Sequence, residues 1–118
     1  MAVEVTTVIC LPMPPSGNGL FPGRSRRYRS PEYKAWADEA GWELARQRPV
    51  SVTGRVSLLI EVAEPKTKRA TDVTNRIKAV EDLLVSHGVI QGDDQRYVRR
   101  VTAEWADIDG IRITVEAV

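Results

Sequence analysis

Apolar and polar residues alternate along four stretches of the chain, and a helical spacing runs through two others. The alternation predicts strands over residues 3–11, 52–62, 97–105 and 111–117, where β-branched residues are frequent. The helical spacing predicts one helix from residue 30 to about 48 and a second over 72–87. The expected order is therefore β-α-β-α-β-β.

Both helices have recognisable ends. Ser30 before Pro31 predicts a helix start, because serine caps free amides and proline is tolerated in the first turn. Pro49 ends this pattern, and Gly88 ends the second. The first helix places four apolar residues on one face: Trp36, Ala37, Ala40 and Leu44. The second repeats at steps of four and three: Val73, Ile77, Val80, Leu84 and His87.

This order predicts an α/β (α+β) fold, a mixed sheet covered by two helices. Asp109-Gly110 lies between the last two predicted strands and is typical of a tight hairpin turn, so we expect these strands to pair antiparallel. The chain has 118 residues, of which 42% are apolar, and this fits one domain over residues 1–118 with a modest core.

Cys10 is the only cysteine and lies within an apolar run, so we expect a small core filler and no disulfide within the chain. This favours a reducing, cytoplasmic location. The chain shows no secretory signal pattern and no apolar run near the ~20 residues that span a bilayer, so we expect a soluble protein without a membrane partner.

Positive charge is concentrated locally rather than spread over the chain. The 17 Lys and Arg nearly balance the 16 Asp and Glu, which excludes a histone-like basic protein. Residues 12–29 are rich in proline, glycine and arginine and predict a long basic loop. The basic residues form three clusters: Arg24, Arg26, Arg27 and Arg29; Lys66, Lys68 and Arg69; Arg96, Arg99 and Arg100.

Carboxylates stand at both ends of the second helix. Asp72 precedes it, and Asp93 and Asp94 follow it after two glycines that allow the chain to reverse. If the chain folds back, these carboxylate oxygens form a site suited to Mg²⁺, which also binds a phosphate of the substrate. Lys78, one turn into the helix, would face that phosphate. Basic clusters around such a site suit a phosphodiester substrate.

Structural interpretations compete with this one. Taken alone, Asp72 is more typical of a helix cap than of a metal ligand. Asp93-Asp94 after a glycine is typical of a solvated turn, and Lys78 with Asp82 of a surface pair. His87 is the only histidine, and its place in the apolar pattern predicts a core or boundary position, which leaves no site needing two histidines.

Two pairs of motifs resemble those of the RusA family of Holliday-junction resolvases. "PMPPSGNGLF" followed by "RRYRSPEYKAW" is similar to the PPS-x-N loop and first helix of that family. "DVTNRIKAVEDLL" followed by "GVIQGDDQ" is similar to its D-x-D-N-x-x-K helix and following D-D. The resemblance covers nearly the whole chain in order.

The resemblance implies a RusA-like fold and a homodimer that cuts branched DNA, namely four-way junctions, with Mg²⁺ or with Mn²⁺ as a substitute, in DNA recombination and repair. It implies that Asp72, Lys78 and Asp94 are catalytic and that Asp72 and Asp94, with Asp93 as companion, bind the metal. The second aspartate of the D-x-D-N pattern falls on Thr74, a weaker and neutral Mg²⁺ ligand. The expected DNA-binding residues are Asn18, Arg24, Arg26, Arg27, Lys66, Lys68, Arg69, Arg96 and Arg99.

Three functions remain open. The chain is expected to be a Mg²⁺-dependent, structure-selective endodeoxyribonuclease that hydrolyses phosphodiester bonds of Holliday junctions. The alternative is a junction-binding recombination or repair protein whose cleavage is weakened or lost because Thr74 replaces a metal-binding aspartate. A plain α/β interaction domain with a merely charged surface is the third, and binding to branched against linear DNA separates it from the others.

Overall fold

A computed structural model describes residues 5–15, 30–66 and 70–118 of the chain. The predicted order of elements is confirmed. These elements are β1 (Thr6–Leu11), α1 (Pro31–Gln47), β2 (Val56–Ala63), the 3₁₀ turn η2 (Val73–Arg76), α2 (Ile77–Ser86), β3 (Val98–Ala106) and β4 (Ile111–Ala117). None of the helices in these three described stretches is long and apolar enough to cross a membrane.

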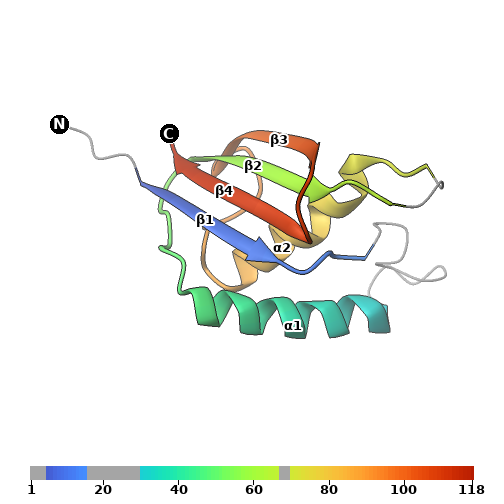
Figure 1. Cartoon of the computed structure of the whole chain (residues 1–118). Coiled ribbons are helices and arrows are strands. Elements are labelled where there is room, and N and C mark those ends of the chain that lie inside the picture. Colours follow the sequence, from blue (N-terminus) through green and yellow to red (C-terminus); the bar gives the residue numbers. More distant parts are fainter. Residues whose placement is uncertain (1–4, 16–29, 67–69) are drawn as a thin grey trace.

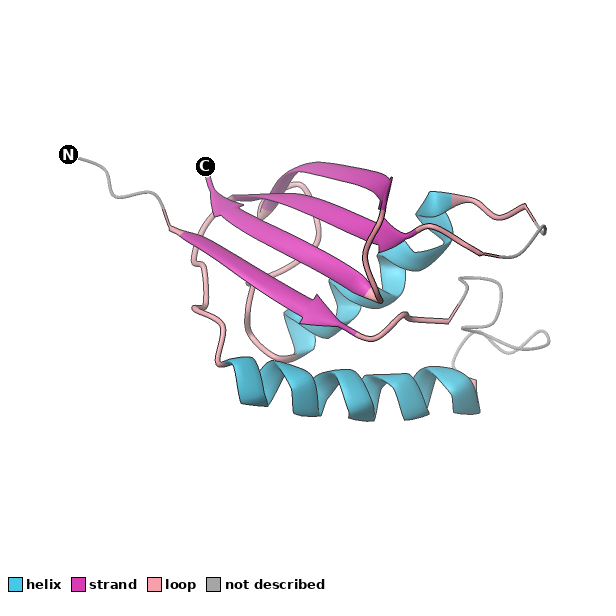
Figure 2. Ribbon diagram, in the orientation of Figure 1, coloured by secondary structure: helices cyan, strands magenta, loops and turns pink. Residues whose placement is uncertain are grey.

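The four strands form one mixed sheet in the order β1-β4-β2-β3. β4 pairs antiparallel with β1 and with β2, whereas β2 and β3 are parallel. Both helices cover the same face of the sheet, and the opposite face carries no helix (Figure 1). The secondary-structure colouring shows α1 and α2 side by side against this single layer of strands (Figure 2). The predicted mixed sheet with two helices is therefore confirmed.

Alternation in the strands and helical spacing in α1 and α2 build one apolar core between the layers. Strands β1, β2 and β4 supply every second residue, including fully buried Ile60 and Ile113. From α1 come Tyr33, Trp36, Ala40 and Leu44, and from α2 come Ala79, Val80, Leu83 and Leu84. The Ser30 hydroxyl accepts the Tyr33 amide at 3.1 Å, which confirms the predicted cap.

The expected hairpin between the last two strands is wrong. β2 lies between β3 and β4, so the residues around Asp109-Gly110 cross over the end of β2 instead of joining paired neighbours. The Ala63 amide donates to the Gly110 carbonyl at 3.0 Å, and the Glu64 amide donates to the Ala106 carbonyl at 3.1 Å. Gly110 does adopt the left-handed conformation that glycine tolerates (φ 68°), but the connection it belongs to crosses a strand and is not a tight hairpin turn.

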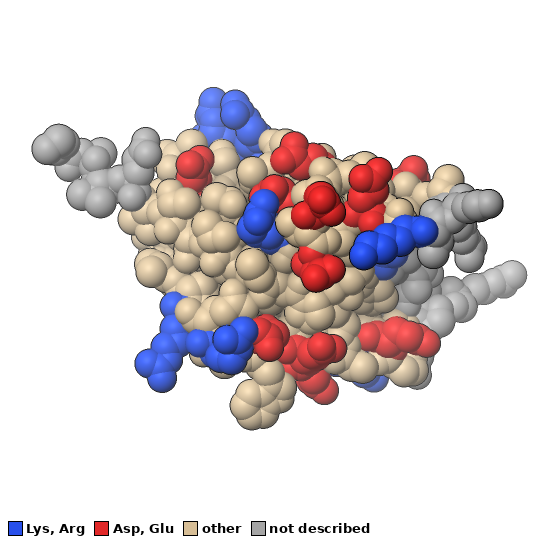
Figure 3. Space-filling model, in the orientation of Figure 1, with Lys and Arg blue, Asp and Glu red and all other residues tan. Residues whose placement is uncertain are grey.

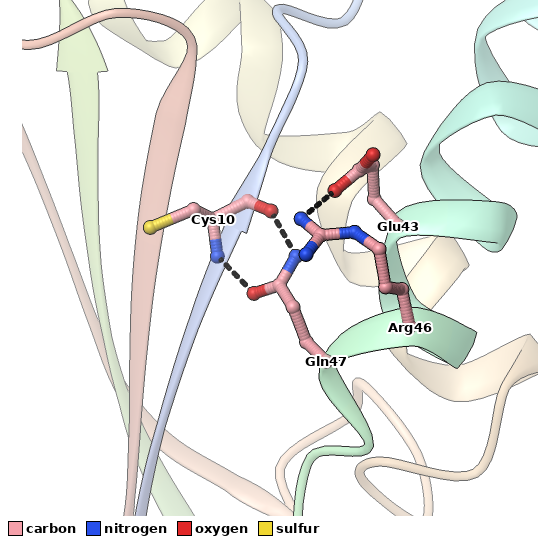
Figure 4. Close-up of polar contacts among 4 residues, drawn as sticks. All are labelled: Cys10, Glu43, Arg46 and Gln47. Carbon is pink, nitrogen blue, oxygen red and sulfur yellow. Dashed lines mark hydrogen bonds and ion pairs between the residues drawn. The ribbon is translucent and has the colours of Figure 1, made fainter.

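Cys10 is exposed, which contradicts the expected core position. Thr7, Ile9 and Leu11 take the buried side of β1, and alternation turns Cys10 to the outer face. β1 is an edge strand of the sheet, and the Gln47 side chain of α1 hydrogen-bonds both the amide and the carbonyl of Cys10 (Figure 4). Gln47 Oε1 accepts from the Cys10 amide at 2.9 Å, and Nε2 donates to its carbonyl at 2.6 Å.

His87 is also exposed, so its predicted core or boundary position is wrong. It directly follows the last residue of α2 and lies beside Gly41 of α1. A Cβ added to Gly41 would stand only 3.1 Å from His87 Cε1. The helical spacing continues to residue 87, but burial ends with Leu84 because the chain turns at Gly88 (φ 71°).

Candidate active site at the start of α2

The beginning of the second helix is a 3₁₀ turn that leaves its first polar side chains exposed. Asp72 stands at the cap position of η2 with extended backbone, but its carboxylate makes no capping hydrogen bond. Thr74, two residues on, is exposed as well. Simple helix capping therefore does not account for Asp72, and its oxygens are accessible to a ligand from solvent.

Arg76 ties this helix start to the segment that follows β1. Its guanidinium donates to the Pro14 carbonyl, and burial lowers the pKa of Arg76. Trp36 of α1 fixes the same segment by donating from Nε1 to the Pro12 carbonyl at 2.8 Å. The beginning of the proline-rich stretch is thus held beside the residues between Asp72 and Lys78.

The segment between α2 and β3 turns back and is anchored at several points. Val89 and Ile90 are buried, and the Val89 carbonyl accepts the Val52 amide at 2.8 Å. Gly92 lies so close to the Tyr97 ring that an added Cβ would meet Cδ2 at 2.5 Å. These contacts turn the chain back after α2 and place Asp93 against that helix.

Lys78 joins the helix to this loop. Its Nζ lies 2.8 Å from Asp93 Oδ2 and 3.0 Å from Asp82 Oδ1, the second being the predicted i, i+4 pair. Hydrogen bonds to Asp93 and then Asp82 raise the pKa of Lys78 well above its usual value, against the opposing effect of burial. The lysine is therefore a fixed positive charge at the site.

Asp94 is held by Arg96 rather than by the helix. The arginine donates from Nε at 3.1 Å and from a terminal nitrogen at 2.8 Å to the two carboxylate oxygens, and its backbone amide donates at 2.9 Å. These hydrogen bonds, the side-chain ones first, lower the pKa of Asp94 to about 2. The carboxylate is therefore ionised throughout the neutral pH range.

Glu81 is a carboxylate of this region that the sequence interpretation did not single out. It is partly buried, and burial first and the Asp93 charge second raise its pKa. A sequence signal was available, because Glu81 lies three residues after Lys78 and therefore on the same side of the helix. Glu81, Asp82 and Asp93 thus surround the Lys78 ammonium with negative charge.

The donor chemistry of the three predicted metal ligands fits Mg²⁺, which binds one or two carboxylates and keeps several waters. The structure brings Asp93 to Lys78 but does not gather Asp72, Asp93 and Asp94 into one cage. Within the described parts of the chain, no three Asp, Glu, His or Cys side chains stand close enough together to hold a metal ion. Any cation there would use water and substrate oxygens beside the carboxylates.

The expected DNA-binding residues divide into two groups. Three of them are exposed: Lys66 shortly after the end of β2, Arg99 on β3, and Arg96, which is paired with Asp94. The others lie outside the described residues: Asn18, Arg24, Arg26, Arg27, Lys68 and Arg69.

One protein family matches nearly the whole chain. The model of this family, described as endodeoxyribonuclease RusA, matches residues 5–116. A comparison with curated proteins finds no match. The family match includes every described residue of the helix start and of the Asp93-Asp94 loop.

Proposed function

This chain belongs to the RusA endodeoxyribonuclease family, and from this premise we propose that it cuts four-way DNA junctions in a Mg²⁺-dependent reaction. The chain is thus an endodeoxyribonuclease of a resolvase family. The contact between Lys78 and Asp93 carries the proposal of a site, because it joins the helix start to the acidic loop across 15 residues of sequence. The proposed substrate is branched DNA, and the proposed location of the protein is the cytoplasm.

Each residue of the site has a proposed role, which the resemblance to the family motif implies. Asp72 and Asp94 supply metal ligands, with Asp93 assisting. The bound Mg²⁺ would orient and activate a water for in-line attack on phosphorus and neutralise developing negative charge. Lys78, kept protonated by Asp93 and Asp82, donates to the phosphate or its leaving oxygen. No covalent intermediate is required.

Cleavage of a synthetic four-way junction tests this function. The protein is incubated with labelled junction in Mg²⁺, in Mn²⁺ and in EDTA, beside linear duplex of the same sequence. We expect symmetric nicks in the junction with either metal, little cleavage of the duplex, and none in EDTA. Equal cutting of duplex and junction would reject structure selectivity, and cutting in EDTA would reject metal dependence.

A junction-binding protein with weakened cleavage is the second candidate. Thr74 favours it, because this exposed position beside Asp72 carries a hydroxyl where the family motif carries an aspartate. Tight junction binding without measurable nicking at millimolar Mg²⁺ would select this candidate over an active nuclease.

We expect the protein to form a homodimer, since symmetric resolution of a junction requires two sites, one for each cleaved strand. Light scattering after gel filtration measures the mass directly. A dimer has about twice the 13.2 kDa mass of the chain. A species of single-chain mass at micromolar concentration, in the presence and absence of junction, would contradict this expectation.

A further inference from the structure

Three arginines line an open hollow where the parallel strands β2 and β3 begin. The hollow has a volume of about 380 Å³ and is lined by Arg55, Gln95, Val98, Arg99 and Arg100. Gln95 directly follows Asp94, so the hollow borders the acidic loop of the candidate active site. It is nevertheless built from other residues than those of the candidate site.

A β-bulge explains why consecutive arginines reach the same hollow. Val56 of β2 pairs with Val98, but the next residue, Ser57, pairs with Arg100, which leaves Arg99 as an extra residue in β3. In a regular strand, neighbouring side chains point to opposite faces, whereas a bulge breaks this alternation and turns a side chain. Arg99 and Arg100 can therefore both line the space that Arg55, the residue just before β2, borders from the other side.

The charges of these three arginines are not neutralised within the described chain. Other arginines are engaged: Arg46 by Glu43, Arg96 by Asp94, Arg112 by Glu61, and Arg76 by the Pro14 carbonyl. By contrast, Arg55, Arg99 and Arg100 have no carboxylate or carbonyl partner among the residues the structure describes. Their guanidinium donors are free for an anionic ligand.

The surrounding surface restricts where a polyanion can lie. Figure 3 shows acidic side chains spread over the open face of the sheet, with one basic group at the β3 edge and other basic side chains within the face and beside α1. Glu104 and Glu116 are exposed on this open face, and Glu61 there already holds Arg112. A DNA backbone is therefore repelled from the middle of the sheet and attracted to the β3 edge.

We infer that this hollow, referred to below as the β3 arginine hollow (Arg55, Gln95, Arg99 and Arg100), binds backbone phosphates of a DNA arm next to the cleaved strand. The inference rests on the proposed function. Guanidinium forks match phosphate oxygens in a bidentate manner, and the Gln95 amide adds a neutral donor. The contact is independent of sequence and positions the junction so that the scissile phosphate reaches Lys78 and Asp94.

Salt-dependent binding tests the hollow separately from catalysis. The full chain and the triple variant Arg55→Gln, Arg99→Gln, Arg100→Gln are titrated onto a labelled four-way junction in EDTA at several salt concentrations. Three lost phosphate contacts should reduce the slope of log affinity against log salt by about 2 to 3 and weaken binding at least about tenfold near 0.1 M salt. The corresponding Arg→Lys triple keeps the charges and should keep most of the slope.

A matched control removes three charges from the opposite side of the molecule. The control variant combines three substitutions on α1 or at its end, among acidic residues: Lys34→Gln, Arg46→Gln and Arg48→Gln. It should change the affinity for the junction by less than about threefold. Thermal unfolding checks that both triples fold. If the first triple is unstable, Arg99→Gln alone should reduce the slope by about 1.

The outcomes separate this inference from the proposed function. A wild type that binds and cuts the junction, together with a folded triple variant of unchanged slope, would overturn the hollow and leave the nuclease function intact. A wild type that neither binds nor cuts branched DNA would overturn both. An equal loss in the α1 control would show a general charge effect and would also overturn the hollow.

Discussion

Asp94→Asn is expected to lower Mg²⁺-dependent cleavage of a four-way junction by at least about 100-fold, while junction binding stays the same or tightens. The substitution removes a charged oxygen ligand but keeps the shape of the loop, because the Asp94 carbonyl still accepts the Tyr97 and Val98 amides. It also removes the negative charge and one of the two acceptor oxygens that hold Arg96, which leaves a positive charge without its ion pair beside the β3 arginine hollow.

Single-turnover cleavage and gel-shift binding measure the two effects on the same junction. Asp107→Asn is the matched control, since it removes one exposed aspartate from the connection between β3 and β4, away from the loop. This control should cut within about twofold of the wild-type rate. Wild-type cleavage by Asp94→Asn would show that Asp94 is not a metal ligand and that its pairing with Arg96 is structural.

The elements of this fold could be predicted from the sequence because their signals are local. Alternation marks the strands, and Ser30-Pro31 and Gly88 mark helix ends through backbone chemistry that does not depend on the rest of the chain. The boundaries moved by a few residues, and the second helix begins as a 3₁₀ turn around Thr74.

Strand order could not be predicted in the same way, because it depends on which strand fills the space next to another. The turn at Asp109-Gly110 has the residues of a hairpin, yet β2 occupies the position between the strands it connects. The connection between Ala106 and Ile111 is long enough to cross one strand. Hydrogen bonds from the Ala63 and Glu64 amides to carbonyls at its two ends hold it over the end of β2. The local signal therefore indicated a change of direction with a left-handed glycine, but it gave the wrong strand partner.

The candidate site divides along the same line. The sequence allowed the acidic loop to return toward α2 through its two glycines and predicted the Lys78–Asp82 pair, but it did not predict the contact between Lys78 and Asp93. Arg99 and Arg100 formed a basic cluster already in the sequence, but the hollow they line did not follow from it, because the bulge at Arg99 is visible only once the register of β2 and β3 is known. Arg55 also lies more than forty residues before Arg99 in the sequence, so nothing local joins them.

Thr74→Asp is expected to increase cleavage at limiting Mg²⁺ and to lower the Mg²⁺ concentration for half-maximal rate by about tenfold. Thr74 is exposed two residues after Asp72, whose carboxylate has no capping role, so an added carboxylate meets solvent and metal rather than packed side chains. One additional charged oxygen donor worth about 1.4 kcal/mol in metal binding corresponds to this tenfold shift. Thr74→Asn is the matched control, because it adds a neutral oxygen of the same reach and should give little of the gain.

Metal titrations of wild type, Thr74→Asp and Asp93→Asn decide whether the natural site is short of one ligand. If Asp93 already supplies the missing oxygen, Asp93→Asn will be as damaging as Asp94→Asn, and Thr74→Asp will crowd a complete site. Asp93→Asn also weakens the hold on Lys78, which then relies on its contact with Asp82. Raising the Mg²⁺ concentration separates the two effects of this variant. Excess metal rescues the loss of a metal ligand but does not restore a displaced lysine. A wild type saturated at low Mg²⁺, with no gain in Thr74→Asp, would reject the weakened site and with it the junction-binding alternative that rests on Thr74.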